Sequence, residues 1–527
     1  MSWPLSPTVL AQPEPDPVTP ALSASALPAL GDASSLELSP RAERRLGDRI
    51  MRSILRDPDV IDDPLVLEYV QSIWTSLLKA AQLRGEIGSE LESVHAWRPF
   101  LVRDRTVNAF ALPGGYIGIH LGLLAMTGTP DELASVMAHE LSHVTQRHIA
   151  RMIGQQSRQS WVSLASMVLG VLAASRAPAA AQAMIYGGQA VAIQGQLNFS
   201  RDMEREADRV GFAVLNEAGF EPAGMAQMFE HLQQASRLND DGSFPYLRTH
   251  PLTSERIGEA RSRLGVQGWR TAAAAGEKDS AIWAQHVLMA SRARVLMDTR
   301  SVSLNNLLNP EVRRGTDPLQ AMATWYRAGL ATQRTGDSSK AMSHFLQARS
   351  LVASLPPAQQ PVALRVLTLS QADLQLGSRQ PVDAAQTLNR EFSAGKAAMS
   401  LTARPELMMQ AQIAMLLPDS SNLPATWADI AARLQTHVSN QPEDAAAWAA
   451  LGELWQRLKQ PLRAVRAEAE AAAALGDLPG AIDRIQAAQK RFRQPSSADV
   501  IELSVMDSRL KTWQRQQRED MREESGR

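Results

Sequence analysis

Two histidines four positions apart, with a glutamate directly after the first, give the pattern His139-Glu140-x-x-His143. Four residues advance an α-helix by about 400°, so both imidazoles lie on one helix face and can reach one metal ion. Glu140 can then reach a water molecule at that ion and accept its proton. The alternative is two surface histidines without a metal, a pattern that chance gives in about one chain in a hundred of this composition. The motif predicts a zinc site that hydrolyses peptide bonds.

The chain has no cysteine, so any metal must be held by His, Asp or Glu. A catalytic zinc usually takes three protein ligands, which leaves one to be found. Glu204 and Asp208 share one face of a later acidic helix. We expect Glu204 to be the third ligand and Asp208 to accept the outer N–H of a ligating histidine. The prediction is one zinc ion per chain and no other cofactor.

Three further polar residues lie close to these motifs in the sequence. His250 precedes a proline that fixes the local backbone. Its ring could stabilise an oxyanion, cap the zinc in a resting state, or have no role in the site. Glu206 points away from Glu204 and is expected to be solvated or ion-paired. His148 is rotated by about 140° from His143 and is expected to be structural.

The helix that carries the motif has a clear start signal. Thr129 is a good N-cap, Pro130 suits the first helical position, and Glu132 completes a capping box. Two amphipathic helices, over residues 41–56 and 63–82, are expected before it. Between them and the motif, residues 93–119 have strand-like patterning, and a Pro-Gly-Gly sequence marks a turn between two short strands.

The chain has 527 residues, which is enough for two or three domains. The apolar content of 44% is ordinary for a globular protein, and the net charge of -1 gives no reason to expect nucleic acid. We expect a mostly α fold, with a zincin-type metallopeptidase domain that holds a small β-sheet and a helical solenoid after it. The predicted divisions are a leader at 1–40, the peptidase domain at 41–265 and the repeat domain at 266–527.

Past residue 270 strand patterns disappear, and the composition favours successive helices. The stretch 322–355 has the tetratricopeptide pattern, in which small residues let paired helices approach and aromatics fill the space between them. Copies are expected over 362–392, 448–471 and 476–488, which is enough for a stable solenoid. A plain helical bundle is the alternative. The charged end, 511–527, is expected to be a fraying, solvated helix.

The beginning of the leader, residues 1–40, looks like the end of a secretory signal. The positively charged start and the longer apolar core of a full signal are missing. We interpret it as a truncated signal remnant or a disordered leader, which would direct the protein to the periplasm. Residues 161–193 are apolar and almost uncharged, but the apolar run is too short to span a bilayer. They either complete the domain core or form a lid that contacts the membrane surface peripherally.

The combination of His139-Glu140-x-x-His143, Glu204-x-x-x-Asp208 and His250-Pro251 resembles the peptidase family of the CAAX prenyl proteases. The resemblance implies a zincin peptidase in which Glu140 is catalytic and His250 is a regulatory ligand at the zinc. It also implies an edge strand that pairs with substrate, made of Asn108, Ala109, Phe110, Ala111 and Leu112. The prenyl proteases span the membrane many times and this chain does not, so a prenylated membrane tail is not the expected substrate.

With the repeat tail, the chain is similar to a periplasmic branch of that family. This similarity implies hydrolysis of misfolded or stalled envelope proteins and help in the assembly of outer-membrane β-barrel proteins. Unfolded proteins would be the substrates, and the outer-membrane assembly machinery would bind the concave face of the solenoid. The alternative is a chaperone or adaptor that acts through its solenoid and has a largely latent zinc site. A degradation assay of the Glu140→Gln variant would separate the two.

Overall fold

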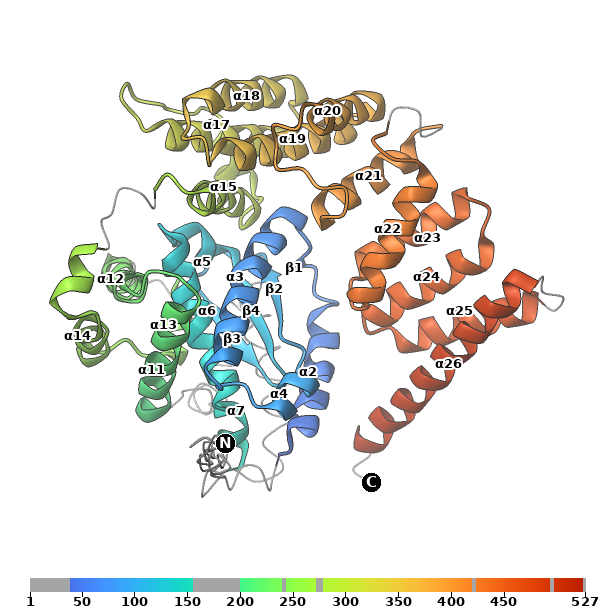
Figure 1. Cartoon of the computed structure of the whole chain (residues 1–527), viewed down its shortest axis with the longest axis horizontal. Coiled ribbons are helices and arrows are strands. Elements are labelled where there is room, and N and C mark those ends of the chain that lie inside the picture. The colour runs from blue at the N-terminus through green and yellow to red at the C-terminus, as the bar shows by residue number, and fades with distance from the viewer. Residues whose placement is uncertain are drawn as a thin grey trace, which may run out of the picture.

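The computed structural model describes residues 38–154, 200–238, 243–271, 278–418, 423–492 and 497–524. These residues are mostly helical, with one small mixed sheet, which confirms the predicted fold class. Figure 1 shows a first part that contains the sheet, coloured blue to green, and later helices that run over it and down one side. No helix in the described ranges combines the length and apolar character needed to cross a bilayer. Residues 161–193 and nearly all of the leader lie outside the described residues.

The sheet has the strand order β1-β2-β4-β3. Its strands are β1 (Val60–Ile61), β2 (Arg98–Val102), β3 (Ala109–Leu112) and β4 (Tyr116–His120). β2 and β4 are parallel, and the other two pairs are antiparallel, so β1 and β3 form opposite edges. The predicted Pro-Gly-Gly turn joins β3 to β4. Gly114 and Gly115 have φ of 77° and 84° there, which glycine adopts without strain.

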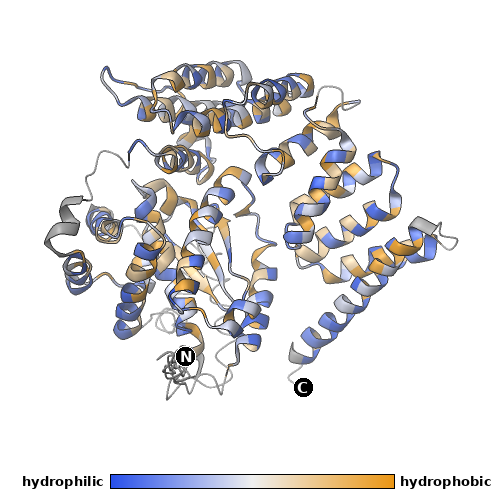
Figure 2. Cartoon of the chain, in the orientation of Figure 1, coloured by the Kyte–Doolittle hydropathy of each residue, from blue (hydrophilic) through white to orange (hydrophobic). Residues whose placement is uncertain are grey.

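Ten helices of the described chain surround this sheet or extend from it. They are α2 (Pro40–Ile54), α3 (Pro64–Leu83), α4 (Ser89–Val94), α5 (Leu121–Met126), α6 (Pro130–Thr145), α7 (His148–Gly154), α11 (Arg201–Glu217), α12 (Ala223–Leu238), α13 (Tyr246–Thr249) and α14 (Ser254–Thr271). The predicted helices at 41–56 and 63–82 correspond to α2 and α3. Every residue of α6 is buried, and the helix packs against α11, α12 and β3. Figure 2 shows that the strands behind these helices are largely hydrophobic.

The start of α6 differs from the prediction in one detail. The Thr129 hydroxyl accepts a hydrogen bond from the Glu132 amide at 3.1 Å, as an N-cap does. The Glu132 carboxylate, however, accepts from the Gly128 amide at 2.7 Å rather than from Thr129. A ring nitrogen of His231, on α12, lies 3.2 Å from the same carboxylate oxygen. The Glu132 carboxylate therefore bonds to Gly128 and contacts α12 instead of bonding to the Thr129 amide. The predicted capping box is only half formed.

After α14 the described chain is entirely helical. The helices are α15 (Ala281–Leu296), α16 (Ser301–Asn305), α17 (Pro318–Thr335), α18 (Ser338–Ser350), η1 (Val352–Ser354), α19 (Gln360–Gly377), α20 (Pro381–Ala394), α21 (Arg404–Leu416), α22 (Trp427–Asn440), α23 (Ala445–Arg457), α24 (Pro461–Ala474), α25 (Leu478–Arg491) and α26 (Ser497–Glu524). Most pack on the next helix in sequence, as the helices of a solenoid do. In the α17–α18 pair, a Cβ at Gly329 would lie 2.6 Å from the Phe345 ring, so a small residue is required there.

The charged end of the chain is helical, as we expected, and most of its described residues are exposed or half-buried. α26 continues to Glu524, and its Met506, Leu510 and Trp513 are buried against α24 and α25. Asp520 also pairs with Arg52 of α2 at 2.9 Å. Arg56, just after α2, donates a hydrogen bond to the carbonyl of Gly476, just before α25, at 3.2 Å. Apolar contacts therefore fix the middle of α26, while the described charged residues after Trp513 are exposed or half-buried.

Three arginines of the later helices join the two parts of the molecule. Each guanidinium reaches a carboxylate at or near the start of α3. The pairs are Arg292–Asp63 at 2.7 Å, Arg365–Glu68 at 2.6 Å and Arg404–Asp62 at 2.6 Å. Arg365 and Arg404 each hold a second carboxylate within the helical part, Glu406 and Asp444. The helical part is therefore attached to the first part by forked, largely desolvated contacts.

Candidate metal centre

The two motif histidines project from the middle of the buried helix α6. Their Nε2 atoms lie 3.0 Å apart, so His139 and His143 face one point. Both rings are buried, with exposed fractions of 2% or less. Two buried imidazole nitrogens this close favour a shared proton or cation between them. The spacing of the motif on a straight helix is sufficient to produce this convergence.

α11 brings Glu204 to the same point. Its carboxylate oxygens lie 3.4 Å from His139 Nε2 and 3.5 Å from His143 Nε2. Close packing makes this possible, because a Cβ at Gly211 would lie only 3.2 Å from the backbone of Ala138 on α6. A larger residue at 211 would push the two helices apart and withdraw the carboxylate.

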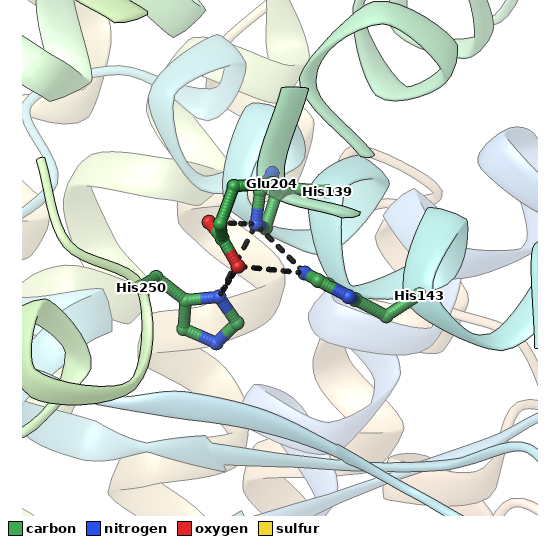
Figure 3. A group of neighbouring side chains, drawn as sticks. All are labelled: His139, His143, Glu204 and His250. Atoms are coloured by element: carbon green, nitrogen blue, oxygen red, sulfur yellow. Dashed lines mark hydrogen bonds and ion pairs between the residues drawn. The ribbon is translucent and has the colours of Figure 1, made fainter. Parts of the chain in front are cut away.

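His250 completes the cluster from the turn after α13. Its Nδ1 lies 2.9 Å from Glu204 Oε1 and 3.3 Å from His139 Nε2. The Tyr246 ring stacks on it, with centroids 4.7 Å apart and planes inclined by 30°. One ligand atom from each of His139, His143, Glu204 and His250 lies within 4.8 Å of the others. Figure 3 shows these four side chains pointing toward one another, with the carboxylate between the rings.

Glu140 lies between this cluster and the edge strand β3. Its Oε2 accepts a hydrogen bond from the Ala111 amide at 3.1 Å, and its Oε1 lies 3.4 Å from His250 Nε2. Of the five residues predicted to pair with substrate, Ala109 to Leu112 form β3, and Asn108 directly precedes it. The expected edge position of this strand is confirmed.

Asp208 and Arg256 form a second layer behind the cluster. Asp208 Oδ1 lies 2.9 Å from His139 Nδ1, the outer nitrogen of that ring. Arg256 of α14 donates two hydrogen bonds to Asp208, at 2.6 and 2.8 Å. It also reaches Glu204 Oε2 at 2.8 Å and the Pro251 carbonyl at 3.0 Å. The sequence motifs did not predict Arg256, although two carboxylates on a buried helix face require a nearby cation.

His143 has its own outer partner, which sequence analysis also missed. His148 Nδ1 lies 2.8 Å from His143 Nδ1, and its Nε2 lies 3.1 Å from Glu206. Glu206 also pairs with Arg151 at 2.9 Å, so it is ion-paired, one of the two states that we expected. The expected rotation of His148 away from the metal face is correct. That rotation is what directs its ring at the outer nitrogen of His143.

The protonation pattern of the cluster fits a site for a cation. Burial would lower the pKa of His139, but hydrogen bonds with Asp208 and Glu204 outweigh burial and raise it to about 10. Burial would raise the pKa of Glu204, but His250 and His139 hold it well below its usual range. Burial raises the pKa of Glu140. A protonated imidazole supplies the positive charge that a metal ion would supply in this site. Imidazoles together with a carboxylate are a typical set of zinc ligands.

Comparisons with known proteins agree with this geometry. Residues 67–264 match the model of peptidase family M48. The chain is 27% identical over 504 residues to the β-barrel assembly-enhancing protease of Escherichia coli K12, covering 93% of this chain and 94% of that protein. It is 39% identical over 237 residues to a protein of Vibrio cholerae named as a putative protease of this kind, covering 45% and 47%. A mitochondrial metalloendopeptidase OMA1 of Arabidopsis thaliana is 32% identical over 179 residues, covering 34% and 33%.

Proposed function

Because the chain belongs to peptidase family M48 through residues 67–264, we propose that it is a zinc-dependent endopeptidase of the bacterial envelope. It would hydrolyse misfolded or stalled proteins and assist the assembly of outer-membrane β-barrel proteins. The observation that carries the proposal is the convergence of four buried ligand groups beside Glu140 and the edge strand β3. The substrate class follows the names of the relatives in Escherichia coli and Vibrio cholerae.

His139, His143 and Glu204 would hold one zinc ion per chain. When bound, the ion would polarise the scissile carbonyl and acidify the attacking water. Glu140 would accept the proton of that water and return it to the leaving amine. Its burial supports this role, since a carboxylate with a raised pKa exchanges a proton near neutral pH more readily. Asp208 and His148 would hold the two zinc-binding rings through their outer nitrogens.

An extended substrate would add to the sheet at β3. Residues 108–112 would pair with it through main-chain hydrogen bonds, as in other cases of β-strand addition. The Ala111 amide, which donates to Glu140, would place the scissile bond next to that carboxylate.

His250 would act as a ligand that closes the site at rest. The support is its contact with Glu204 Oε1 at 2.9 Å, within the group of ligand atoms. Because the His250 turn follows the four-residue helix α13, a small movement of that helix would remove the ring from the site. The other role left open by the sequence, stabilisation of an oxyanion, requires the ring to remain near the reacting carbonyl.

The domain assignment is 41–265 for the peptidase and 266–527 for a tetratricopeptide domain, preceded by the leader at 1–40. The concave face of the repeats would recruit the outer-membrane assembly machinery, and the protein would act in the periplasm. Residues 161–193 would contribute a peripheral membrane contact near the site. The sequential packing of α17 to α25 supports the repeat assignment.

The test is degradation of casein and of an unfolded β-barrel protein by the wild type and by the Glu140→Gln variant. Glutamine cannot accept the proton of water, so cleavage should be lost while zinc content and fold are retained. Glu204→Ala should instead lower the zinc content sharply. Activity near the wild-type level in Glu140→Gln would identify another base. Barrel assembly that survives in this variant, with no cleavage by the wild type, would favour the chaperone alternative.

A further inference from the structure

A hollow of about 260 Å³ lies at the junction of the two parts, away from the metal centre. One wall is the segment that contains Val60 and Ile61 of β1, and the opposite wall holds Leu296 and Arg334 of α15 and α17. Arg103, which follows β2, also lines it. Because β1 and β3 are opposite edges of the sheet, this hollow is distinct from the proposed substrate strand.

Two aspartates and two arginines line this hollow. Both aspartates have arginine partners from outside the lining, Asp62 with Arg404 at 2.6 Å and Asp63 with Arg292 at 2.7 Å, and Arg404 is shared with Asp444. Among the residues that the structure describes, Arg103 and Arg334 have no carboxylate within ion-pair distance. Their guanidinium groups therefore face the hollow without a matching anion.

Two more arginines, Arg294 and Arg327, lie on the same two helices, α15 and α17. Arg327 lies seven residues before Arg334 on α17, which puts both on one helix face. Arg327 is half-buried and, in the described part of the chain, has no ion pair. Burial lowers its pKa, and repulsion from Arg294 on α15 adds to that effect. Arg294 itself donates only to the Ala125 carbonyl. Desolvated positive charge of this kind is stabilised by an incoming anion.

We propose that this hollow binds an acidic, extended segment of another polypeptide, with carboxylates between Arg103 and Arg334 and its main chain beside β1. Two observations favour a peptide. Three neighbouring arginines that join the two parts, Arg292, Arg365 and Arg404, are each met by a carboxylate. The wall opposite the helices is a sheet edge, which accepts an extended main chain. This binding goes beyond the proposed function and does not depend on peptide cleavage.

The experiment measures fluorescence anisotropy of a short labelled peptide that alternates glutamate and valine, with full-length Glu140→Gln protein so that cleavage cannot interfere. A glutamine–valine peptide is the uncharged comparison. The test variant is Arg103→Ala with Arg334→Ala. The control is Arg313→Ala with Arg314→Ala, which removes the same charge from an exposed stretch before α17. We expect the test variant to weaken binding of the acidic peptide about tenfold or more, and the control to leave it unchanged.

Equal losses in both double variants would show non-specific attraction and overturn the proposal, as would equal binding of the uncharged peptide. Inorganic phosphate and phosphatidylglycerol vesicles are added as competitors. If either binds through Arg103 and Arg334 and the acidic peptide does not, the site recognises phosphate or a membrane surface and the peptide assignment is wrong. Arg334→Gln alone, at an exposed helix position, repeats the test should the double variant fail to fold.

Discussion

Arg256 is the residue that connects the parts of the candidate metal centre. Its guanidinium forks onto Asp208, reaches Glu204 and holds the Pro251 carbonyl next to His250. It stacks over the Phe229 ring, with 5.1 Å between the guanidinium carbon and the ring centroid. The planar fork matches a carboxylate in a way that a lysine cannot. Arg256 therefore positions the carboxylates and the His250 turn together, without touching a reacting atom.

We predict that Arg256→Gln weakens zinc binding by about 10–100-fold, the usual cost of losing an outer partner of a metal ligand. Arg256→Lys should restore charge but not geometry and recover only part of the affinity. Competition with a chelator measures the zinc affinity of each variant directly. Arg261→Gln, which removes an exposed arginine from the same helix, is the matched control. An unchanged zinc affinity in Arg256→Gln would assign the residue to packing alone.

For His250 we predict that substitution by alanine raises basal proteolysis several-fold, because removing a resting ligand increases the population of open sites. Initial rates on casein and zinc content should be measured together. His231→Ala is the control, since that half-exposed histidine lies outside the cluster. A lower rate at unchanged zinc content would instead assign His250 to the transition state.

At the scale of elements, the local signals in the sequence were reliable. The start of α6, the β3–β4 turn and the helical character after residue 270 follow from caps, glycines and periodicity, each of which acts within a few residues. Pairings through space were not predictable in the same way. In the sheet, β4 lies between β2 and β3. Local sequence patterns identify strands but do not indicate which strands pair with one another. Arg256 and His148 were missed for the same reason, because their partners lie on other elements.

A buried histidine on α15, His286, is one of the residues that join this helix to the first part of the molecule. His286 Nε2 must donate to the Thr127 carbonyl, at 3.0 Å, since a carbonyl only accepts. Its Nδ1 is then an acceptor for the Tyr69 hydroxyl, at 2.7 Å. The ring is therefore required in its neutral form, and burial lowers its pKa to about 4.

This lowered pKa predicts a loss of stability in mild acid. Because the folded pKa lies below the ordinary value of about 6.5, the contribution of neutral His286 is complete above pH 6.5 and is lost as the pH falls toward 4. The loss is roughly 3 kcal/mol over that window. In His286→Gln, which does not titrate, the fall in denaturation free energy between pH 7 and pH 4.5 should be smaller than in the wild type. A His231→Gln variant with the same reduction would refute the assignment.

At the scale of the whole molecule, the helical part is attached through arginines, and Arg365 and Arg404 each hold carboxylates on both sides of the junction. Arg404 shows the arrangement most fully, because it pairs with Asp62 near α3 and Asp444 before α23. Its side chain is only 12% exposed. Burial would raise the pKa of Asp444, but hydrogen bonds from Arg404 and His437 outweigh it and hold that pKa below its usual range. The guanidinium therefore stabilises the ionised form of Asp444.

We predict that Arg404→Leu destabilises the attachment by about 3 kcal/mol, since it leaves the mostly buried carboxylate of Asp444 without its guanidinium partner. The melting temperature should fall, and protease sensitivity should increase near the junction. Adding Asp444→Asn to that variant should recover part of the loss, because it removes one uncompensated charge. Additive effects of the two changes would contradict a direct interaction.

The contacts of α2 with the distant end of the chain also set an order of events during synthesis. Arg52 and its partner Asp520 are separated by 468 residues. At about 5–20 residues per second, a ribosome needs roughly half a minute to a minute and a half to make the intervening chain. Throughout that interval, one side of the first described helix lacks its final neighbour. A newly made chain therefore passes through a period in which the sheet and its surrounding helices can be assembled while the last helices are still missing.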